Sequence, residues 1–141
     1  MGGDLPGFSA LYDDPARALL LGAARVESAG YGRWARLREV AELARGLGVA
    51  RLGLACCPDM RGLAEQAAGV LSEQGFEQVL LPEGRSDDPV TQARTFAKGG
   101  VELNVIAGLC VVHELAFLQA TSTPTVGLFA RDRRLAHNPA A

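Results

Sequence analysis

The amino-acid sequence predicts a small α/β domain with a doubly wound, Rossmann- or flavodoxin-like fold, in which helices cover both faces of a four-stranded, mainly parallel sheet. Two observations support this prediction. Four short apolar runs, bounded by glycine, proline or charged residues, are typical of buried strands. Segments whose apolar residues recur at helical spacing separate these runs. Because crossovers between parallel strands are right-handed, we expect the strand order 2-1-3-4.

Two helices are expected before the first strand. Residues 1–13 are rich in glycine and proline and predict a flexible arm, so that residues 14–141 form the single domain. The first helix begins at Pro15, after two aspartates that can cap it, and runs to about residue 29. The second covers residues 34–47, where apolar positions recur every three or four residues and glycines follow.

The rest of the chain alternates strand and helix. Strands are expected at the four apolar runs, which are residues 51–56, 76–81, 103–107 and 125–130. Helices are expected between them at residues 59–74, 87–98 and 114–120. In the first of these helices Asp59 is the expected cap. Its core-facing residues are expected to be Leu63, Ala67, Val70 and Leu71.

The composition excludes several classes of function. A net charge of -2, with no lysine- or arginine-rich run, argues against a nucleic-acid binder. No apolar segment approaches the ~20 residues that span a bilayer. The N-terminus lacks the basic start and long apolar stretch of a secretory signal. The phosphate-loop and dinucleotide-binding glycine motifs are also absent. We therefore expect a cytoplasmic protein whose partner is a small molecule or a metal ion.

Reactive side chains follow the first and third predicted strands. Cys56 and Cys57 end the first strand, and Cys110 follows the third, with His113 three residues later. These strands are neighbours in the predicted order, so their carboxyl ends meet at one crevice. A helix start and an imidazole both favour thiolate, which predicts Cys110 as a nucleophile with His113 as its base. Cys56 is expected to be a core residue, and Cys57 to be intermediate in reactivity.

The segment after the last strand is expected to fold over the same crevice. Arg131, Asp132 and Asn138 are the candidate ligand-binding residues there, with the arginines of this segment binding an anion. The alternative is that Arg131 and Arg133 only solvate the edge of the sheet or pair with Asp132. His137 lies in the same segment. Since the chain has three cysteines, an odd number, they are more plausibly thiols, metal ligands or a redox pair than a disulfide framework.

Several stretches together resemble domain-of-unknown-function family 1847, a family of small cysteine-rich bacterial proteins described as metal-binding. The matching stretches are Tyr31-Gly32-Arg33-Trp34-Ala35-Arg36, Gly53-Leu54-Ala55-Cys56-Cys57, Asp88-Pro89-Val90-Thr91-Gln92-Ala93, Leu103-Asn104-Val105, Gly108-Leu109-Cys110-Val111-Val112-His113 and Arg131-Asp132-Arg133 through His137-Asn138-Pro139. The resemblance runs from about Asp14 to the end of the chain and keeps the order of the motifs.

The resemblance implies a metal site that is reduced in this chain. Its ligands would be Cys57, Cys110, His113 and His137, which fall on the family's cysteine and histidine positions. The family's N-terminal cysteine cluster is missing, and Asp87 stands where the family tends to have a further cysteine. With three cysteines in all, an iron–sulfur cluster held by four cysteines of one chain is excluded. Mixed cysteine and histidine ligation favours zinc, or another transition metal.

Three classes of function are left open by the sequence. The first is a metal-binding, thiol-redox or sulfur-handling protein with a cysteine and histidine site. The second is a metal-free thiol enzyme with Cys110 as its nucleophile. The third is a non-catalytic binding or scaffold module that retains the fold. The sequence decides neither the substrate nor whether the sheet edge pairs in a homodimer.

Overall fold

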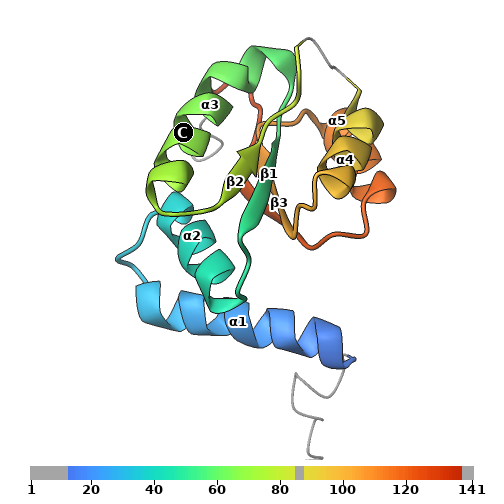
Figure 1. Cartoon of the computed structure of the whole chain (residues 1–141). Coiled ribbons are helices and arrows are strands. Elements are labelled where there is room, and N and C mark those ends of the chain that lie inside the picture. The colour runs from blue at the N-terminus through green and yellow to red at the C-terminus, as the bar shows by residue number, and fades with distance from the viewer. Residues whose placement is uncertain (1–12, 85–87, 138–141) are drawn as a thin grey trace, which may run out of the picture. The chain divides into compact units, whose positions relative to one another are not determined.

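The computed structural model describes residues 13–84 and 88–137 (Figure 1). The chain divides into two compact units, Met1–Gly48 and Val49–Ala141, and each is described by itself. The flexible arm expected at residues 1–13 lies outside the described residues, apart from Asp13. The extent of the domain, residues 14–141, stays a prediction.

The first unit contains the two expected helices, α1 (Asp14–Gly30) and α2 (Arg36–Gly46). Asp13 caps α1, because its Oδ1 accepts a hydrogen bond of 2.9 Å from the backbone N–H of Ala16. The turn between the helices depends on Gly30. A Cβ atom there would lie 2.4 Å from the ring of Trp34, so only glycine lets the ring pack against the end of α1.

The second unit is built on a four-stranded parallel sheet in the order β2-β1-β3-β4, which confirms the predicted fold class and strand order. The strands are β1 (Arg51–Ala55), β2 (Gln78–Leu80), β3 (Leu103–Ala107) and β4 (Thr125–Phe129). The two central strands, β1 and β3, are almost entirely buried. Burial on both faces explains why they appear in the sequence as continuous apolar runs.

Helices cover both faces of this sheet. A short 3-10 helix, η2 (Pro58–Met60), leads into α3 (Arg61–Glu73), and α4 (Pro89–Lys98) and α5 (Val111–Ala120) follow later in the chain. In Figure 1, α3 lies on one side of the sheet, while α4 and α5 lie together on the other. Asp88 caps α4, because its carboxylate accepts hydrogen bonds from the backbone N–H groups of Val90 and Thr91.

The predicted core face of α3 is partly wrong. Leu63 and Val70 were expected to face inward, but they are 44% and 42% exposed. The buried stripe consists of Ala64, Ala67, Ala68 and Leu71. Both stripes have helical spacing. The one that faces the sheet has mostly small side chains, which let the helix approach closely.

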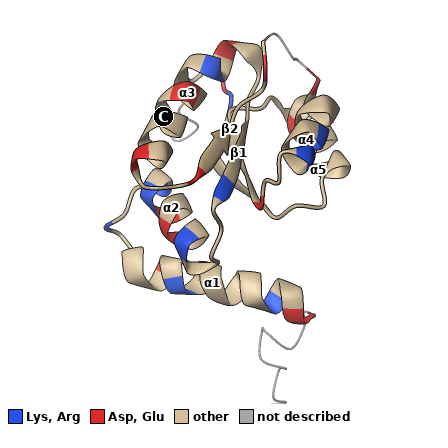
Figure 2. Cartoon of the chain, in the orientation of Figure 1, with Lys and Arg blue, Asp and Glu red and all other residues tan. Residues whose placement is uncertain are grey.

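Several element boundaries also differ from prediction, most of all those of α5 and β2. α5 begins at Val111, three residues before the expected start, and β2 has three residues where six were expected. Basic and acidic residues are interspersed along α2 and α3 (Figure 2). Among the described residues, no helix combines the length and the apolar character needed to cross a membrane.

Candidate functional site

The two chain segments that leave the central strands are joined just beyond the sheet. The backbone N–H of Cys57, which follows β1, donates a hydrogen bond of 2.8 Å to the carbonyl of Gly108, which follows β3. This bond fixes the loop that carries Cys57 against the loop that carries Cys110. The expected crevice at the carboxyl ends of neighbouring strands is therefore where the cysteines gather.

Gly108 is required by its conformation and by its surroundings. Its φ of +95° lies in the left-handed region, and an added Cβ would lie 2.7 Å from Cε of Met60 and 2.8 Å from its Cβ. Met60 is itself buried beneath the loop. The turn from β3 towards Cys110 therefore requires glycine at position 108.

Gln92 holds the other loop and was not identified as a site residue from the sequence. This α4 side chain is 2% exposed. Its Oε1 accepts a hydrogen bond of 3.2 Å from the N–H of Cys56, and its Nε2 donates one of 3.0 Å to the Cys56 carbonyl. The Cys56 thiol is buried beside this clamp, and burial raises its pKa to about 11. Gln92 thus fixes the backbone immediately before Cys57.

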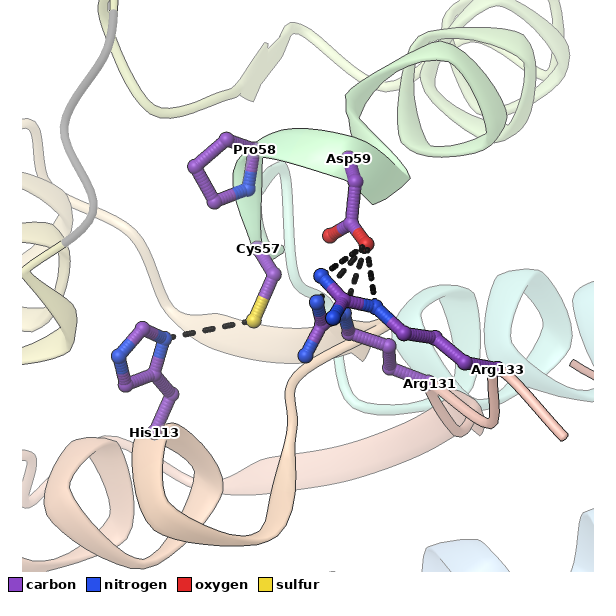
Figure 3. Close-up of a pocket in the computed structure, with 6 residues that line it drawn as sticks. All are labelled: Cys57, Pro58, Asp59, His113, Arg131 and Arg133. Carbon is purple, nitrogen blue, oxygen red and sulfur yellow. Dashed lines mark hydrogen bonds and ion pairs between the residues drawn. The ribbon is translucent and has the colours of Figure 1, made fainter.

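Three candidate ligands from the sequence come together. Sγ of Cys57 lies 3.3 Å from Nδ1 of His113 and accepts a hydrogen bond of 3.3 Å from the N–H of Cys110. The ligand atoms of Cys57, Cys110 and His113 all lie within 4.8 Å of one another. Figure 3 shows the His113 ring directed at the Cys57 sulfur. The arrangement is compatible with a metal-binding site.

The two thiols of this group differ in acidity. The pKa of Cys110 is lowered, chiefly because the backbone N–H of His113, at the start of α5, stabilises the thiolate. The pKa of Cys57 is raised, chiefly because the side chain is buried. The two sulfur atoms also influence each other: their proximity lowers the pKa of Cys110 and raises that of Cys57. The His113 ring, expected beside Cys110, has a ligand nitrogen within 4.8 Å of the Cys110 sulfur, and its Nδ1 lies 3.3 Å from the Cys57 sulfur.

A cavity of about 280 Å³ opens beside Cys57 and His113. Its remaining lining is Pro58, Asp59, Arg131 and Arg133. The sequence predicted Asp59 as the cap of the helix that follows, and this prediction is wrong: Asp59 caps neither η2 nor α3. Its Oδ2 instead accepts hydrogen bonds from Nε and Nη2 of Arg131, at 2.9 and 2.8 Å, and it pairs with Nη2 of Arg133 at 3.3 Å (Figure 3). Hydrogen bonding to Arg131 holds the pKa of Asp59 below its ordinary value.

Asp132 and His137 close the turn that carries the arginines. The Asp132 carboxylate accepts hydrogen bonds of 3.0 Å from the N–H groups of Arg134 and Leu135. The Asp132 N–H donates one of 3.0 Å to Nδ1 of His137. His137 does not belong to the group of three clustered ligands. The roles of His137 as a metal ligand and of Asp132 in ligand binding stay predictions. Asn138 lies outside the described residues.

The fold and the site define a small doubly wound α/β protein with two cysteines and a histidine gathered at the carboxyl ends of its central strands. The chain belongs to the DUF1847 family of proteins of unknown function, whose family model matches residues 7–81 and 83–128.

The chain is also similar to an archaeal protein. The uncharacterized protein MJ0455 of the archaeon Methanocaldococcus jannaschii is 26% identical over 137 residues, a match that covers 84% of this chain and 71% of the relative. The family resemblance had suggested bacterial proteins, whereas this relative is archaeal. No solved structure matches the chain.

Proposed function

We propose that this protein binds one transition-metal ion, with zinc preferred, through Sγ of Cys57, Sγ of Cys110 and Nδ1 of His113. The observation that carries the proposal is that the ligand atoms of these three residues lie within 4.8 Å of one another. They converge although Cys57 is 53 residues from Cys110 and 56 residues from His113 in the sequence. Two thiolates and one imidazole form a ligand set that suits zinc and disfavours magnesium or calcium.

The spacing of the ligands fits this proposal. Tetrahedral zinc, with Zn–S bonds of ~2.3 Å and Zn–N bonds of ~2.0 Å, places its ligand atoms about 3.5–3.8 Å apart. The separation of 3.3 Å between Cys57 Sγ and His113 Nδ1 is close to that range. Three protein ligands leave a fourth position for water or substrate, as in catalytic zinc sites. A bound zinc ion would supply Lewis-acid activation of the molecule in that position.

The surrounding residues have positioning roles in this proposal. Gln92 and Gly108 fix the two loops, and the Cys110 N–H already donates to the Cys57 sulfur, an interaction that also stabilises a thiolate there. Cys57 is buried and keeps its proton more strongly than an ordinary thiol, so metal uptake must release that proton. His137 would serve as a fourth ligand only if the C-terminal turn released its bond to Asp132.

Metal analysis of protein purified without oxygen tests the proposal, together with a titration of the apoprotein with Co²⁺, whose thiolate absorption reports on cysteine ligation. The informative variants are Cys57→Ser, Cys110→Ser and His113→Gln, and Cys56→Ala is the matched control. We expect one metal ion per chain in the wild type and in Cys56→Ala, and affinities at least about tenfold lower in the other three. Equal affinities in Cys56→Ala and Cys110→Ser would refute the site.

A second candidate function, metal-free dithiol chemistry, is favoured by the opposite pKa directions of the two thiols. The Cys110 thiolate would attack one sulfur of a substrate disulfide and displace the other sulfur as a thiolate. Cys57, after losing its proton, would attack the Cys110 sulfur in the mixed disulfide. The pair would thereby be oxidised to a disulfide by two electrons, and the substrate reduced to two thiols.

Trapping the mixed disulfide distinguishes this candidate from metal binding. Cys57→Ser should accumulate an adduct at Cys110 with a small disulfide reagent, while Cys110→Ser should not. A wild-type protein that forms no Cys57–Cys110 disulfide under mild oxidation, as seen by peptide mapping, would contradict the dithiol function. If neither metal binding nor thiol exchange is found, the scaffold class predicted from the sequence is the one that survives.

A further inference from the structure

We infer that the cavity beside the cysteine pair binds a small oxyanion, a molecule carrying a carboxylate or a phosphate group, through the guanidinium groups of Arg131 and Arg133. The inference deepens the proposed function, and rests on it for the role of Cys57 and His113, because it assigns the chemical class of the molecule that would meet them. The recognition of the anion itself depends only on the lining of the cavity.

The first argument is the balance of charge. Two guanidinium groups converge on a single oxygen, Oδ2 of Asp59, so one positive charge is left over among these three side chains. Zinc bound by two thiolates and a neutral imidazole adds no net charge, so the excess persists with the metal in place. A cavity with excess positive charge attracts an anion.

The second argument is the number of donors that remain. Arg131 and Arg133 each direct Nε and Nη2 at the Asp59 oxygen. Within the part of the chain that the structure describes, no hydrogen bond engages Nη1 of either arginine. A guanidinium group has five N–H donors, so each side chain keeps three for a ligand, two of them on Nη1. Arginine pairs well with carboxylate and phosphate because its donors match their oxygens.

The third argument is that Arg131 is partly buried and lines the same cavity as Cys57 and His113. The side chain is 16% exposed, whereas that of Arg133 is 74% exposed. An oxyanion held by Arg131 would therefore lie next to the reactive atoms, with Arg133 closing on it from the more open side.

The cavity also limits the size of the ligand. At about 280 Å³ it lies just below the range of ~300–1,000 Å³ found for small-molecule sites. This volume suits a metabolite-sized acid or phosphate ester rather than a segment of a macromolecule.

The inference is tested by calorimetric titration at constant ionic strength, with inorganic phosphate, succinate and propionate as probes and propionamide as the uncharged control. Arg131→Gln and Arg133→Gln remove the proposed donors. Arg134→Gln is the matched control, because Arg134 is an exposed arginine of the same turn that does not contact Asp59. We expect at least one oxyanion to bind the wild type and propionamide not to bind. The preferred probe distinguishes carboxylate from phosphate recognition.

We expect Arg131→Gln to weaken that binding tenfold or more, Arg133→Gln threefold or more, and Arg134→Gln less than twofold. If Arg131→Gln does not fold, Arg131→Lys keeps the charge without the planar fork and should still weaken binding severalfold. Absence of oxyanion binding at millimolar concentration, or equal affinities in Arg131→Gln and Arg134→Gln, overturns the inference.

Performing each titration on zinc-loaded and chelator-treated protein separates the two proposals. Oxyanion binding that depends on Arg131 in a protein unable to bind zinc would refute the metal site and retain the inference. Zinc binding at Cys57, Cys110 and His113 in a protein that binds none of the oxyanions would refute the inference and retain the metal site.

Discussion

Three cysteines lie close together in the sequence or in space, yet their burial, hydrogen bonds and pKa shifts differ. Cys56 is buried, and its pKa is raised to about 11 by burial. Cys57 is also buried but is hydrogen-bonded to the Cys110 N–H, and burial raises its pKa too. Cys110 is partly exposed at the start of α5, where the His113 N–H lowers its pKa. The surroundings of each sulfur atom, and not the residue type, set these differences in pKa.

Alkylation should follow the order Cys110, Cys57, Cys56 in the native, metal-free protein. The thiolate is the reactive form, so a lowered pKa makes Cys110 react at a pH where the other two are still protonated. The measurement is iodoacetamide labelling at pH values from 6 to about 10, followed by peptide mapping. Labelling of all three at one rate, or reaction of Cys110 only after unfolding, would make it an ordinary core residue.

At the scale of elements, the site depends on how β1, β3 and α4 are joined. The Cys57–Gly108 backbone bond extends the pairing of β1 with β3, and Gln92 ties α4 to the end of β1. These contacts hold Cys57 in place before any ligand is bound. Two substitutions in these supports test this view without touching a proposed ligand.

Replacement of Gln92 by methionine, which is similar in volume, should destabilise the protein by roughly 2–6 kcal/mol. The substitution removes the side-chain partner of the N–H and of the carbonyl of Cys56 in a buried position, and each such loss costs about 1–3 kcal/mol. Urea unfolding measures the change, and Gln119→Met, at an exposed position of α5, is the control. Equal stability of the two variants would mean that Gln92 does not support the loop.

Gly108→Ala should cost about 1–3 kcal/mol, because the new methyl group meets Met60 and the backbone has a positive φ. Gly69→Ala should have the opposite sign. Gly69 is an exposed helical glycine, and an added Cβ there would meet nothing within 4 Å, so alanine should stabilise α3 by about 0.5–1 kcal/mol. Thermal unfolding of the two variants gives the comparison, and stabilisation by Gly108→Ala would contradict the account of this loop.

The elements were predictable where their signals are local. Apolar runs of four to six residues located the strands of the sheet, and the Asp88-Pro89 pair marked the start of α4. The core face of α3 could not be predicted, because the exposed Leu63 and Val70 have the same helical spacing as the buried alanines. The positions of Asp59 and Gln92 depend on contacts with residues 72 and 36 positions away, which no local pattern reveals.

At the scale of the whole molecule, the site unites parts of the chain that are distant in sequence. Cys57 follows β1, Cys110 and His113 begin α5, and Arg131 follows β4. The strand order brings these parts together, because β1 and β3 are adjacent and their carboxyl ends point the same way. The sequence could predict this gathering of cysteines, whereas the His113–Cys57 pairing required the side-chain geometry.

Zinc should stabilise the folded protein as a whole. A ligand that binds only the folded state at about 1,000 times its Kd adds roughly 4 kcal/mol to the free energy of unfolding. We expect the midpoint of thermal unfolding to fall when a chelator removes the metal from the wild type and from Cys56→Ala. Cys110→Ser should show a smaller fall, and a chelator effect of the same size in that variant would contradict the ligand assignment.

X-ray absorption at the zinc edge tests the central claim most directly, because it counts the ligands of a bound ion by type and distance. For the zinc-loaded protein the account predicts two sulfur atoms at ~2.3 Å and one imidazole nitrogen at ~2.0 Å, with one further light atom in the fourth position. Cys56→Ala should give the same spectrum, and Cys110→Ser should lose one sulfur. A shell without sulfur, or one unchanged by Cys110→Ser, would contradict the proposed site.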